Sequence, residues 1–469
     1  MDKNNCEIDS MENSCDLREE ENWDFDTKER YGSPRVSSEY MDCSLPLTFD
    51  QYSYCSMKCK YCFAYYQKAM NPSMRSGIKL KGVNVDKLIK MFKGEIPEDP
   101  YYHNFIKKKF PFHWGGLADP FDMVEKKYKL GFKLLETLVE LNYPVIFSTK
   151  GTLPSQEPYY SLFKNAAKNK NFAFQFSIIA NSDELSKKID VAVPTTSERL
   201  QCMKTMSDLG YWTVLRLRPF IVGISDIDVE ELITRSSQNG ANAISTEFYC
   251  YDARCSNNVE IAKRFKEISQ ICGFDIIDFY KKLSPSERGG YRRLNRNLKE
   301  EYVKRMYTTC KKVGMQFNIS DPDFKELNDS GSCCGLPELR EQYDSDLVNW
   351  SRGQLTYHLK ELRKRYWASG GKERYLKIRD VMGDSYDGWL KEPRFYSDSL
   401  KNWATSWAKV NMGYRDEFIQ TWNNTRSSGN PYNYFHGKIK PSYIDDDNNV
   451  VFEYVPHDYE KRWKEEGIL

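Results

Sequence analysis

Short runs rich in β-branched and aromatic residues recur along the chain from about residue 47, and helical patterns separate most of them. The runs cover residues 47–54, 110–116, 144–151, 172–179, 212–221, 243–250 and 315–320. Between them, residues 124–142, 197–210 and 229–240 place apolar side chains at helical spacing. This alternation predicts a parallel sheet with right-handed crossover helices. We therefore expect an α/β fold, a partial (β/α)6-type TIM barrel whose functional groups lie at the carboxyl ends of the strands.

The two ends of the chain differ from this middle part. Residues 1–40 are polar, and the first 30 hold eleven Asp and Glu against four Lys and Arg, which predicts a disordered acidic tail. From about residue 346 the alternation stops, and a helix within 355–379 and a hairpin with its turn at Asp445–Asn449 are expected. We therefore assign the barrel to 41–345 and an α+β accessory region to 346–469.

Composition narrows the class of protein. Hydrophobic residues make up 40% of the chain and aromatic residues 14%, which is enough to bury a core. The net charge of +2 gives no overall attraction to nucleic acid. No apolar run approaches the ~18 residues of a membrane span, and no signal peptide is evident, so a cytoplasmic protein is expected. Thirteen cysteines in such a reducing compartment indicate metal or redox chemistry.

The stretch QYSYCSMKCKYCFAYY, residues 51–66, places Cys55, Cys59 and Cys62 in a C-x3-C-x2-C arrangement. Three loop thiolates can hold three corners of a [4Fe–4S] cluster and leave the fourth iron open to a small molecule. Zinc is the alternative, but structural zinc sites usually pair two C-x2-C knuckles, and no second knuckle follows. The spacing favours a cluster with an open iron.

Together with Tyr61 before the last cysteine, this motif resembles the signature of the radical SAM superfamily. The resemblance implies that the open iron binds S-adenosylmethionine (SAM) through its amino and carboxylate groups. It further implies an enzyme that takes an electron from a reductant such as flavodoxin or ferredoxin. The electron cleaves SAM to a 5′-deoxyadenosyl radical, which abstracts hydrogen from a substrate.

Further motifs make the chain most similar to the spore photoproduct lyase branch of that superfamily. They are the HWGGLADP, FSTKG, FQFSI, SERL and RLRPFIVGISD stretches. By this resemblance, Gly115 and Gly116 receive the methionyl amino group, although the acid of the family's Gly-Gly-Glu step stands late, as Asp119. Lys150 and Ser177 are then expected at the SAM carboxylate and ribose. Tyr61 and Phe63 are expected beside the cofactor, with shielding of the cluster from solvent as the alternative.

Two charged positions have open interpretations. Arg216 and Arg218 alternate with Leu215 and Leu217, so both arginines share one face of a strand. If that face points inward they are cofactor or substrate ligands, and if outward they are packing charges. Glu247 is equally either an inward acid with a catalytic role or a paired structural charge.

Four more cysteines follow predicted strands and are expected near the rim of the barrel: Cys250, Cys255, Cys333 and Cys334. Isolated buried thiols are common, which is the simplest interpretation. One functional alternative is a hydrogen-atom donor or radical relay, for which Cys333 and Cys334 are the candidates. The other is a possible auxiliary [4Fe–4S] cluster that uses all four thiols.

The substrate has to be inferred from the accessory region. Residues 355–379 hold eight Lys and Arg against two Asp and Glu, with aromatic residues between them. Such a segment suits DNA or RNA, because cations neutralise phosphates and rings stack on bases. The alternative is an amphipathic helix packed through Leu355, Leu359 and Leu362. We expect a nucleic acid substrate for repair or base modification, with a peptide or small metabolite, or a non-enzymatic iron–sulfur protein, as alternatives.

Overall fold

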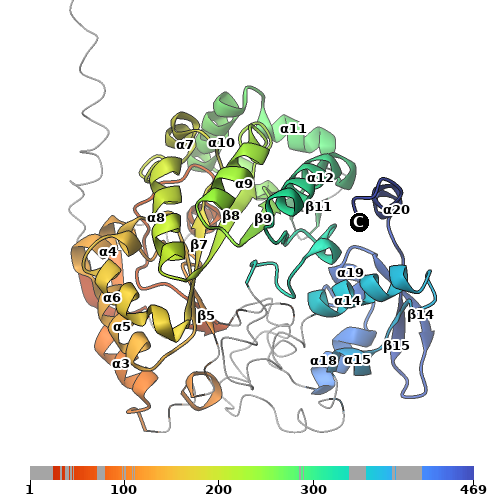
Figure 1. Ribbon diagram of the computed structural model, residues 1–469, viewed down its shortest axis with the longest axis horizontal. Coiled ribbons are helices and arrows are strands. Elements are labelled where there is room, and N and C mark those ends of the chain that lie inside the picture. Colours follow the sequence, from red (N-terminus) through yellow and green to blue (C-terminus); the bar gives the residue numbers. More distant parts are fainter. Residues whose placement is uncertain are drawn as a thin grey trace, which may run out of the picture.

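A parallel sheet forms the centre of the first part of the chain in the computed structural model (Figure 1). Its strands follow the order of the sequence: β3 (Leu47–Phe49), β5 (Phe112–Trp114), β6 (Val145–Thr149), β7 (Phe172–Ser177), β8 (Trp212–Phe220) and β9 (Ala243–Phe248). The short β2 (Arg35–Val36) adds an antiparallel strand beside β3, so that β2 and β9 are the two edges of an open sheet. Six of the predicted runs contain these six strands, which confirms the predicted α/β fold with a partial barrel.

The structure describes residues 25–31, 34–36, 42, 45, 47–70, 80–336 without 98, 100–101, 108, 110, 285–286 and 289, then 355–382, 386 and 415–469. Cys6, Cys15 and Cys43 lie outside these residues, as do most of the predicted tail and the predicted boundary at 345/346. Within 1–40 the prediction of disorder needs a correction, because β1 (Phe25–Tyr31) pairs in parallel with β4 (Leu80–Val83). Pairing with β4 satisfies backbone N–H and C=O groups of β1, and this pairing does not depend on hydrophobic side chains.

Alternation along the strands divides the sheet into two chemically different faces. Phe147, Phe174 and Leu215 lie on the outer face and are fully buried. Their neighbours in sequence, Ser148 and Arg216, lie on the inner face, because successive side chains point to opposite sides of a strand. Parallel sheets that are covered on both sides usually carry apolar side chains on both faces, whereas the inner face of this sheet carries polar side chains.

Helices pack around the sheet; all but the last three connect its strands, and those three follow β9 (Figure 1). In chain order they are α2 (Phe63–Met70), α3 (Val85–Lys93), α4 (Met123–Tyr128), α5 (Leu130–Glu140), α6 (Tyr159–Ala166), α7 (Asp183–Ile189), α8 (Thr196–Asp208), α9 (Val229–Gln238), α10 (Val259–Cys272), α11 (Ile276–Leu283) and α12 (Arg296–Val313). A small antiparallel sheet of β10 (Tyr251–Asp252), β12 (Tyr291–Arg292) and β11 (Glu287–Arg288) follows β9. No helix among the residues described has the length and apolarity needed to cross a membrane.

The predicted strand 315–320 lies parallel to β9, with bridges from Gln316 to Ala243 and from Ile319 to Thr246 and with further backbone hydrogen bonds between the two segments. The chain then passes through the short 3-10 helix η6 (Lys325–Leu327) and turns back under the sheet. Cys334 packs in a small apolar cluster with Ile146 and Ala173 on the inner face. We call residues 330–336 the inner segment, since hydrogen bonds from β7 and β8 hold it there.

The accessory region has its own core. It contains α14 (Leu355–Ala368), the antiparallel sheet of β13 (Tyr375–Leu376), β15 (Val450–Tyr454) and β14 (Ile439–Ile444), and the helices α15 (Ile378–Met382), α18 (Arg415–Asn423), α19 (Pro431–Tyr434) and α20 (Asp458–Glu465). Leu355, Leu359 and Leu362 are buried in this core. The helix 355–379 of the prediction is thus α14, which ends at Ala368, and the predicted hairpin is confirmed as β14 and β15 with the turn between them.

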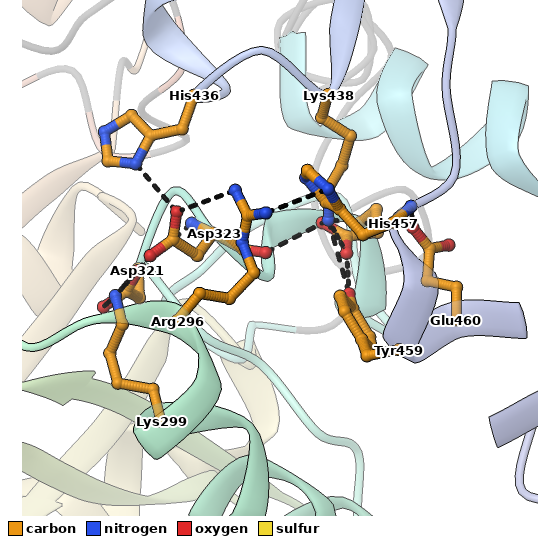
Figure 2. A network of polar contacts seen from close by, with 10 residues as sticks. Arg296, Lys299, Asp321, Asp323, His436, Lys438, His457, Tyr459 and Glu460 are labelled. Atoms are coloured by element: carbon orange, nitrogen blue, oxygen red, sulfur yellow. Dashed lines mark hydrogen bonds and ion pairs between the residues drawn. The ribbon is translucent and has the colours of Figure 1, made fainter. Parts of the chain in front are cut away.

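Buried polar groups join the accessory region to the barrel (Figure 2). Lys438 and Glu326 form an ion pair in which both side chains are fully buried. His436 Nδ1 and Asp323 Oδ1 are 2.9 Å apart, and the Arg296 guanidinium donates to His457 Nδ1 at 2.9 Å. These contacts fix α20 and β14 against η6 and α12.

Candidate functional site

The cysteine loop leaves the carboxyl end of β3 and leads directly into α2. Cys59 and Cys62 face each other across a turn, in which the Cys62 N–H donates to the Cys59 carbonyl at 3.3 Å. Lys58 adopts a left-handed conformation with φ of 50°, which tightens the turn between the first and second cysteines. Strand and loop thus place the three cysteines where functional groups of such folds lie.

All three thiols of the triplet are free. Burial raises the pKa of Cys55 well above its ordinary value, and Asp122 and Asp119 add to this effect. Burial also raises the pKa of Cys59, with Asp190 as the next cause. The Cys59 thiol adds to the raised pKa of Cys55, and the Cys62 thiol adds to that of Cys59, so neighbouring thiols of the triplet are close enough to interact.

The chemistry of these donors fits an iron–sulfur cluster, because it consists of neighbouring unpaired thiols without a fourth cysteine in the loop. Within the described ranges no three His, Cys, Asp or Glu side chains already stand together as a metal site. Metal binding and loss of the thiol protons are coupled, since the thiolate is the ligand. Cluster assembly would therefore have to remove the protons of Cys55 and Cys59, although burial raises the pKa of both thiols.

Asp190, which follows α7, connects the cysteine loop to the barrel. Its Oδ1 accepts the Tyr61 hydroxyl at 2.6 Å, and its Oδ2 lies 3.1 Å from the Arg199 guanidinium of α8. The backbone of Asp190 also forms an antiparallel bridge with Cys59. Burial opposes ionisation, but Lys150 and Arg199 hold the pKa of Asp190 below its usual value. Asp190 was not predicted from the sequence as a site residue, and Arg199 was considered only as the arginine of the SERL motif.

A second buried carboxylate holds the other end of the loop. Asp122 accepts from the Ser56 backbone N–H at 2.7 Å and from the Ser56 hydroxyl at 2.8 Å. The other oxygen of Asp122 caps the first turn of α4. Burial raises the pKa of Asp122 to about 7 despite these hydrogen bonds. The loop is thus fixed next to Cys55 by Asp122 and next to Cys59 by Asp190.

The glycine step after β5 is required by close packing. Gly115 has φ of 108°, and a Cβ there would lie 2.3 Å from the Ser148 carbonyl oxygen. A Cβ on Gly116 would lie 2.4 Å from the Thr48 hydroxyl. Asp50 fixes the residues that follow by accepting the N–H groups of Leu117 and Ala118 at 2.7 and 2.8 Å. The two glycines are accounted for by strand packing, and their predicted contact with a SAM amino group stays a prediction.

Asp119 and Lys150 meet one another beside the cysteine loop, and their predicted contacts with the cofactor stay predictions. Asp119 accepts from the Thr149 hydroxyl at 2.7 Å and from the Lys150 backbone N–H at 2.6 Å. The Lys150 ammonium group donates to the Tyr61 hydroxyl at 2.6 Å and lies 3.7 Å from Asp190. Lys150 therefore brings a positive charge to the cysteine loop.

The remaining predicted cofactor residues differ in accessibility. Tyr61 is buried and engaged with Asp190 and Lys150, so it anchors the loop. Phe63 at the start of α2 is 55% exposed, which leaves its ring open to a ligand. Ser177 at the end of β7 is buried, and its carbonyl accepts from Arg199 at 2.6 Å.

A row of polar side chains crosses the inner face from β5 to β8. His113 Nε2 lies 2.6 Å from the Ser148 hydroxyl, which donates to the Gln175 amide oxygen at 2.6 Å. Arg216 donates to the same oxygen at 3.0 Å. Arg218, two residues further along β8, donates to the Cys333 carbonyl at 2.6 Å. Both arginines thus point inward, as one of the two interpretations of the sequence predicted.

The structure brings Cys333 and Cys334 together but not the four cysteines predicted around an auxiliary cluster. A hydrogen bond joins the two adjacent thiols, and this bond, burial and the neighbouring thiol raise the pKa of Cys333. Cys250 instead lies near Glu247 and Arg293, and Cys255 beside Asp252 and Arg254. The auxiliary cluster therefore stays a prediction.

Glu247 lies at the carboxyl end of β9, where 47% of its side chain is exposed. Its nearest cation is Arg218, with 3.8 Å between Oε2 and Nη1. This separation is beyond a direct hydrogen bond. Glu247 is therefore an accessible, loosely paired carboxylate on the inner side of the barrel.

Most cations of residues 355–379 are used within the protein. Arg363 pairs with the buried Glu460 at 3.0 Å, Arg374 with Glu453 at 3.2 Å and Arg379 with Asp447 at 2.7 Å. Lys364 pairs with Glu361 at 3.1 Å, and Lys360 is itself buried. The alternative of a packed amphipathic helix is thus confirmed, and α14 offers little free positive charge for nucleic acid.

No family model matches the sequence, and no curated protein matches it. Solved structures with a similar chain trace include a point mutant of spore photoproduct lyase, with 14% identity and a TM-score of 0.47 over 63% of this chain and 82% of that one. Spore photoproduct lyase complexed with dinucleoside spore photoproduct has 15% identity and a TM-score of 0.46 over 63% and 82%. Streptococcus suis SuiB bound to S-adenosylmethionine has 16% identity and a TM-score of 0.36 over 65% and 55%.

Proposed function

We propose that the protein is a radical SAM enzyme whose [4Fe–4S] cluster is held by Cys55, Cys59 and Cys62. The observation that supports this most is the run of three free, mutually interacting thiols on a fixed loop at the carboxyl end of the first parallel strand. When bound, the cluster would bind SAM and supply the electron that cleaves it to a 5′-deoxyadenosyl radical.

The surrounding residues have separate tasks in this proposal. Asp122 and Asp190 hold the two ends of the loop through Ser56 and Tyr61. Lys150 supplies a positive charge next to Cys59 and Tyr61, which favours thiolate over thiol. The largely buried wall around the loop excludes water from the reacting atoms.

A nucleic acid is the substrate class that we propose, for repair or base modification, and the motifs shared with the spore photoproduct lyase branch support it. The basic helix does not, because its cations are largely paired within the fold. The two inward arginines of β8 are the better support for a substrate that carries phosphate.

The test of cofactor and reaction is anaerobic reconstitution with iron and sulfide, followed by reduction in the presence of SAM. We expect about four irons per chain and release of 5′-deoxyadenosine and methionine. Replacing any one of Cys55, Cys59 and Cys62 by Ala should abolish both. Cys272→Ala is the matched control, since Cys272 is half-buried on α10 and outside the site. A cluster that is intact and reducible but cleaves no SAM would identify a non-enzymatic iron–sulfur protein.

The substrate class is tested by electrophoretic mobility shift with single-stranded DNA and RNA at increasing salt. A shift that weakens steeply with salt is expected if phosphates are neutralised on binding. Absence of any shift at low salt, with SAM cleavage present, would contradict the nucleic acid proposal and leave a peptide or small metabolite as the substrate.

A further inference from the structure

Two guanidinium groups stand side by side on the inner face of the sheet, and among the described residues they share one carboxylate, Glu247, at 3.8 Å from Arg218. Arg216 and Arg218 are partly exposed. Leu215, before them, and Leu217, between them, are fully buried on the outer face. The neighbours of the arginines come from β7, β9 and the inner segment. None comes from the cysteine loop or from Asp122 and Asp190, which fix that loop.

The protein uses few of the available donors. A guanidinium carries five N–H groups. Within the part of the chain that the structure describes, Arg216 donates one hydrogen bond, to the Gln175 amide oxygen. Arg218 donates one, to the Cys333 carbonyl, and its buried Nε has no partner in the described residues. Both acceptors are neutral, so neither charge is compensated by them.

The groups that face the pair leave an excess of positive charge. Glu247 is the nearest carboxylate, at 3.8 Å from Arg218 and 47% exposed. Burial and then the two arginines lower the pKa of His113 to about 3, so this imidazole is neutral. Burial and then Arg218 lower the pKa of Arg216 to about 10, whereas burial is outweighed at Arg218, where Cys333 and Glu247 raise the pKa. Partly buried cations with unused donors favour an oxyanion.

The inner segment preforms this arrangement. The Cys333 carbonyl accepts from Arg218 at 2.6 Å and from the Ser245 hydroxyl at 2.9 Å. The Cys334 carbonyl accepts the Gln175 amide at 2.7 Å, and Gln175 in turn accepts Arg216. These bonds fix the direction of both guanidiniums before any ligand arrives.

We infer that Arg216 and Arg218 form a subsite for an oxyanion of the substrate, either a phosphate ester or a carboxylate. The inference rests on the proposed function, since it names what the substrate of that site presents. The subsite orients the substrate, and Arg216 and Arg218 act as binding residues and not as catalytic ones.

The test measures binding of four probes to the reconstituted holoenzyme by isothermal titration calorimetry. Inorganic phosphate and the dinucleotide thymidylyl-thymidine represent phosphate, and succinate and the dipeptide Glu-Glu represent carboxylate. We expect at least one pair of probes to bind, and Arg218→Gln to weaken that binding about tenfold or more, because a charge-assisted hydrogen bond is lost. Arg218→Lys keeps the charge but not the planar fork, so an intermediate loss is expected.

The controls separate binding from folding. Arg254→Gln removes a cation that is exposed and paired with Asp252 at the surface, and it should leave probe binding unchanged. The midpoint of thermal unfolding is recorded for each variant, and Arg218→Lys is decisive if Arg218→Gln does not fold. Preference for phosphate or for carboxylate probes identifies the source of the oxyanion, and either preference supports the subsite.

Two results would overturn the inference, namely no binding of any probe to the wild-type protein, or equal affinities for wild type, Arg218→Gln and Arg218→Lys. Neither result depends on SAM cleavage. Conversely, wild-type protein that binds probes through Arg218 but releases no 5′-deoxyadenosine would contradict the proposed function and leave the subsite standing.

Discussion

At the scale of single residues, Asp190 is the group on which the geometry of the cysteine loop depends most. It is fully buried, and its ion-pair partner Arg199 is equally buried. Removing one member of a buried pair leaves the other charge without compensation, which typically costs ~3–5 kcal/mol. Asp190 also orients Tyr61 and the backbone of Cys59.

We therefore expect Asp190→Asn to lower the free energy of unfolding by about 3 kcal/mol and to reduce the iron bound after reconstitution. Chemical denaturation and iron analysis measure the two effects. Glu184→Gln is the matched control, because Glu184 is an exposed α7 carboxylate paired with Lys188. Full iron content in Asp190→Asn would show that the loop assembles without this anchor.

A comparison of Cys59 with Asp190 explains which residues of the site could be predicted from the sequence. The cysteine triplet is local, so its spacing already predicts a shared loop. Asp190 is more than a hundred residues from Tyr61 in sequence, and no pattern around it differs from that of a helix end. Likewise, the inward direction of Arg218 depends on the inner segment, which the sequence placed only at the rim of the barrel.

At the scale of elements, the strands of the sheet were predictable because alternation and β-branched content are strong where both faces are buried. The run 315–320 was also predicted as a strand, and it lies parallel to β9, to which backbone hydrogen bonds join it from Gln316 to Ser320. β1 was missed because its polar sequence carries no hydrophobic signal, although its backbone pairs with β4.

The helix α14 gives a prediction at this scale. Leu359 is fully buried in the core of the accessory region. Replacing it by Ala removes buried methyl groups and leaves a cavity, so the free energy of unfolding should fall by ~2–5 kcal/mol. Urea denaturation measures the change, and the exposed Arg365→Ala is the control on the same helix. A change below about 1 kcal/mol would mean that this core is loosely packed.

At the scale of the whole molecule, His457 at the boundary between barrel and accessory region makes stability depend on pH. Burial and then the cations Lys438 and Arg296 lower the pKa of His457 to about 3. An unfolded histidine titrates near 6.5. The unfolded state therefore takes up the proton first, so this contribution is complete above about pH 6.5 and is lost as the pH falls toward 3.

We expect the free energy of unfolding of wild type to fall more steeply between pH 6.5 and 4 than that of His457→Gln. Denaturation at a series of pH values measures both slopes, with the exposed His103→Gln as control. Parallel curves for wild type and His457→Gln would show that His457 does not contribute to the acid sensitivity.

The buried pair of Lys438 and Glu326 also bears on how such a chain can evolve and be recombined. Each region contributes one member of a fully buried ion pair, so replacing one region alone would leave the other member buried without its partner. A chimera that exchanges the accessory region between relatives would have to exchange Glu326 with it. Variation of the accessory region among such chains is therefore expected to arise by gradual change within both regions together, and not by exchange of whole domains.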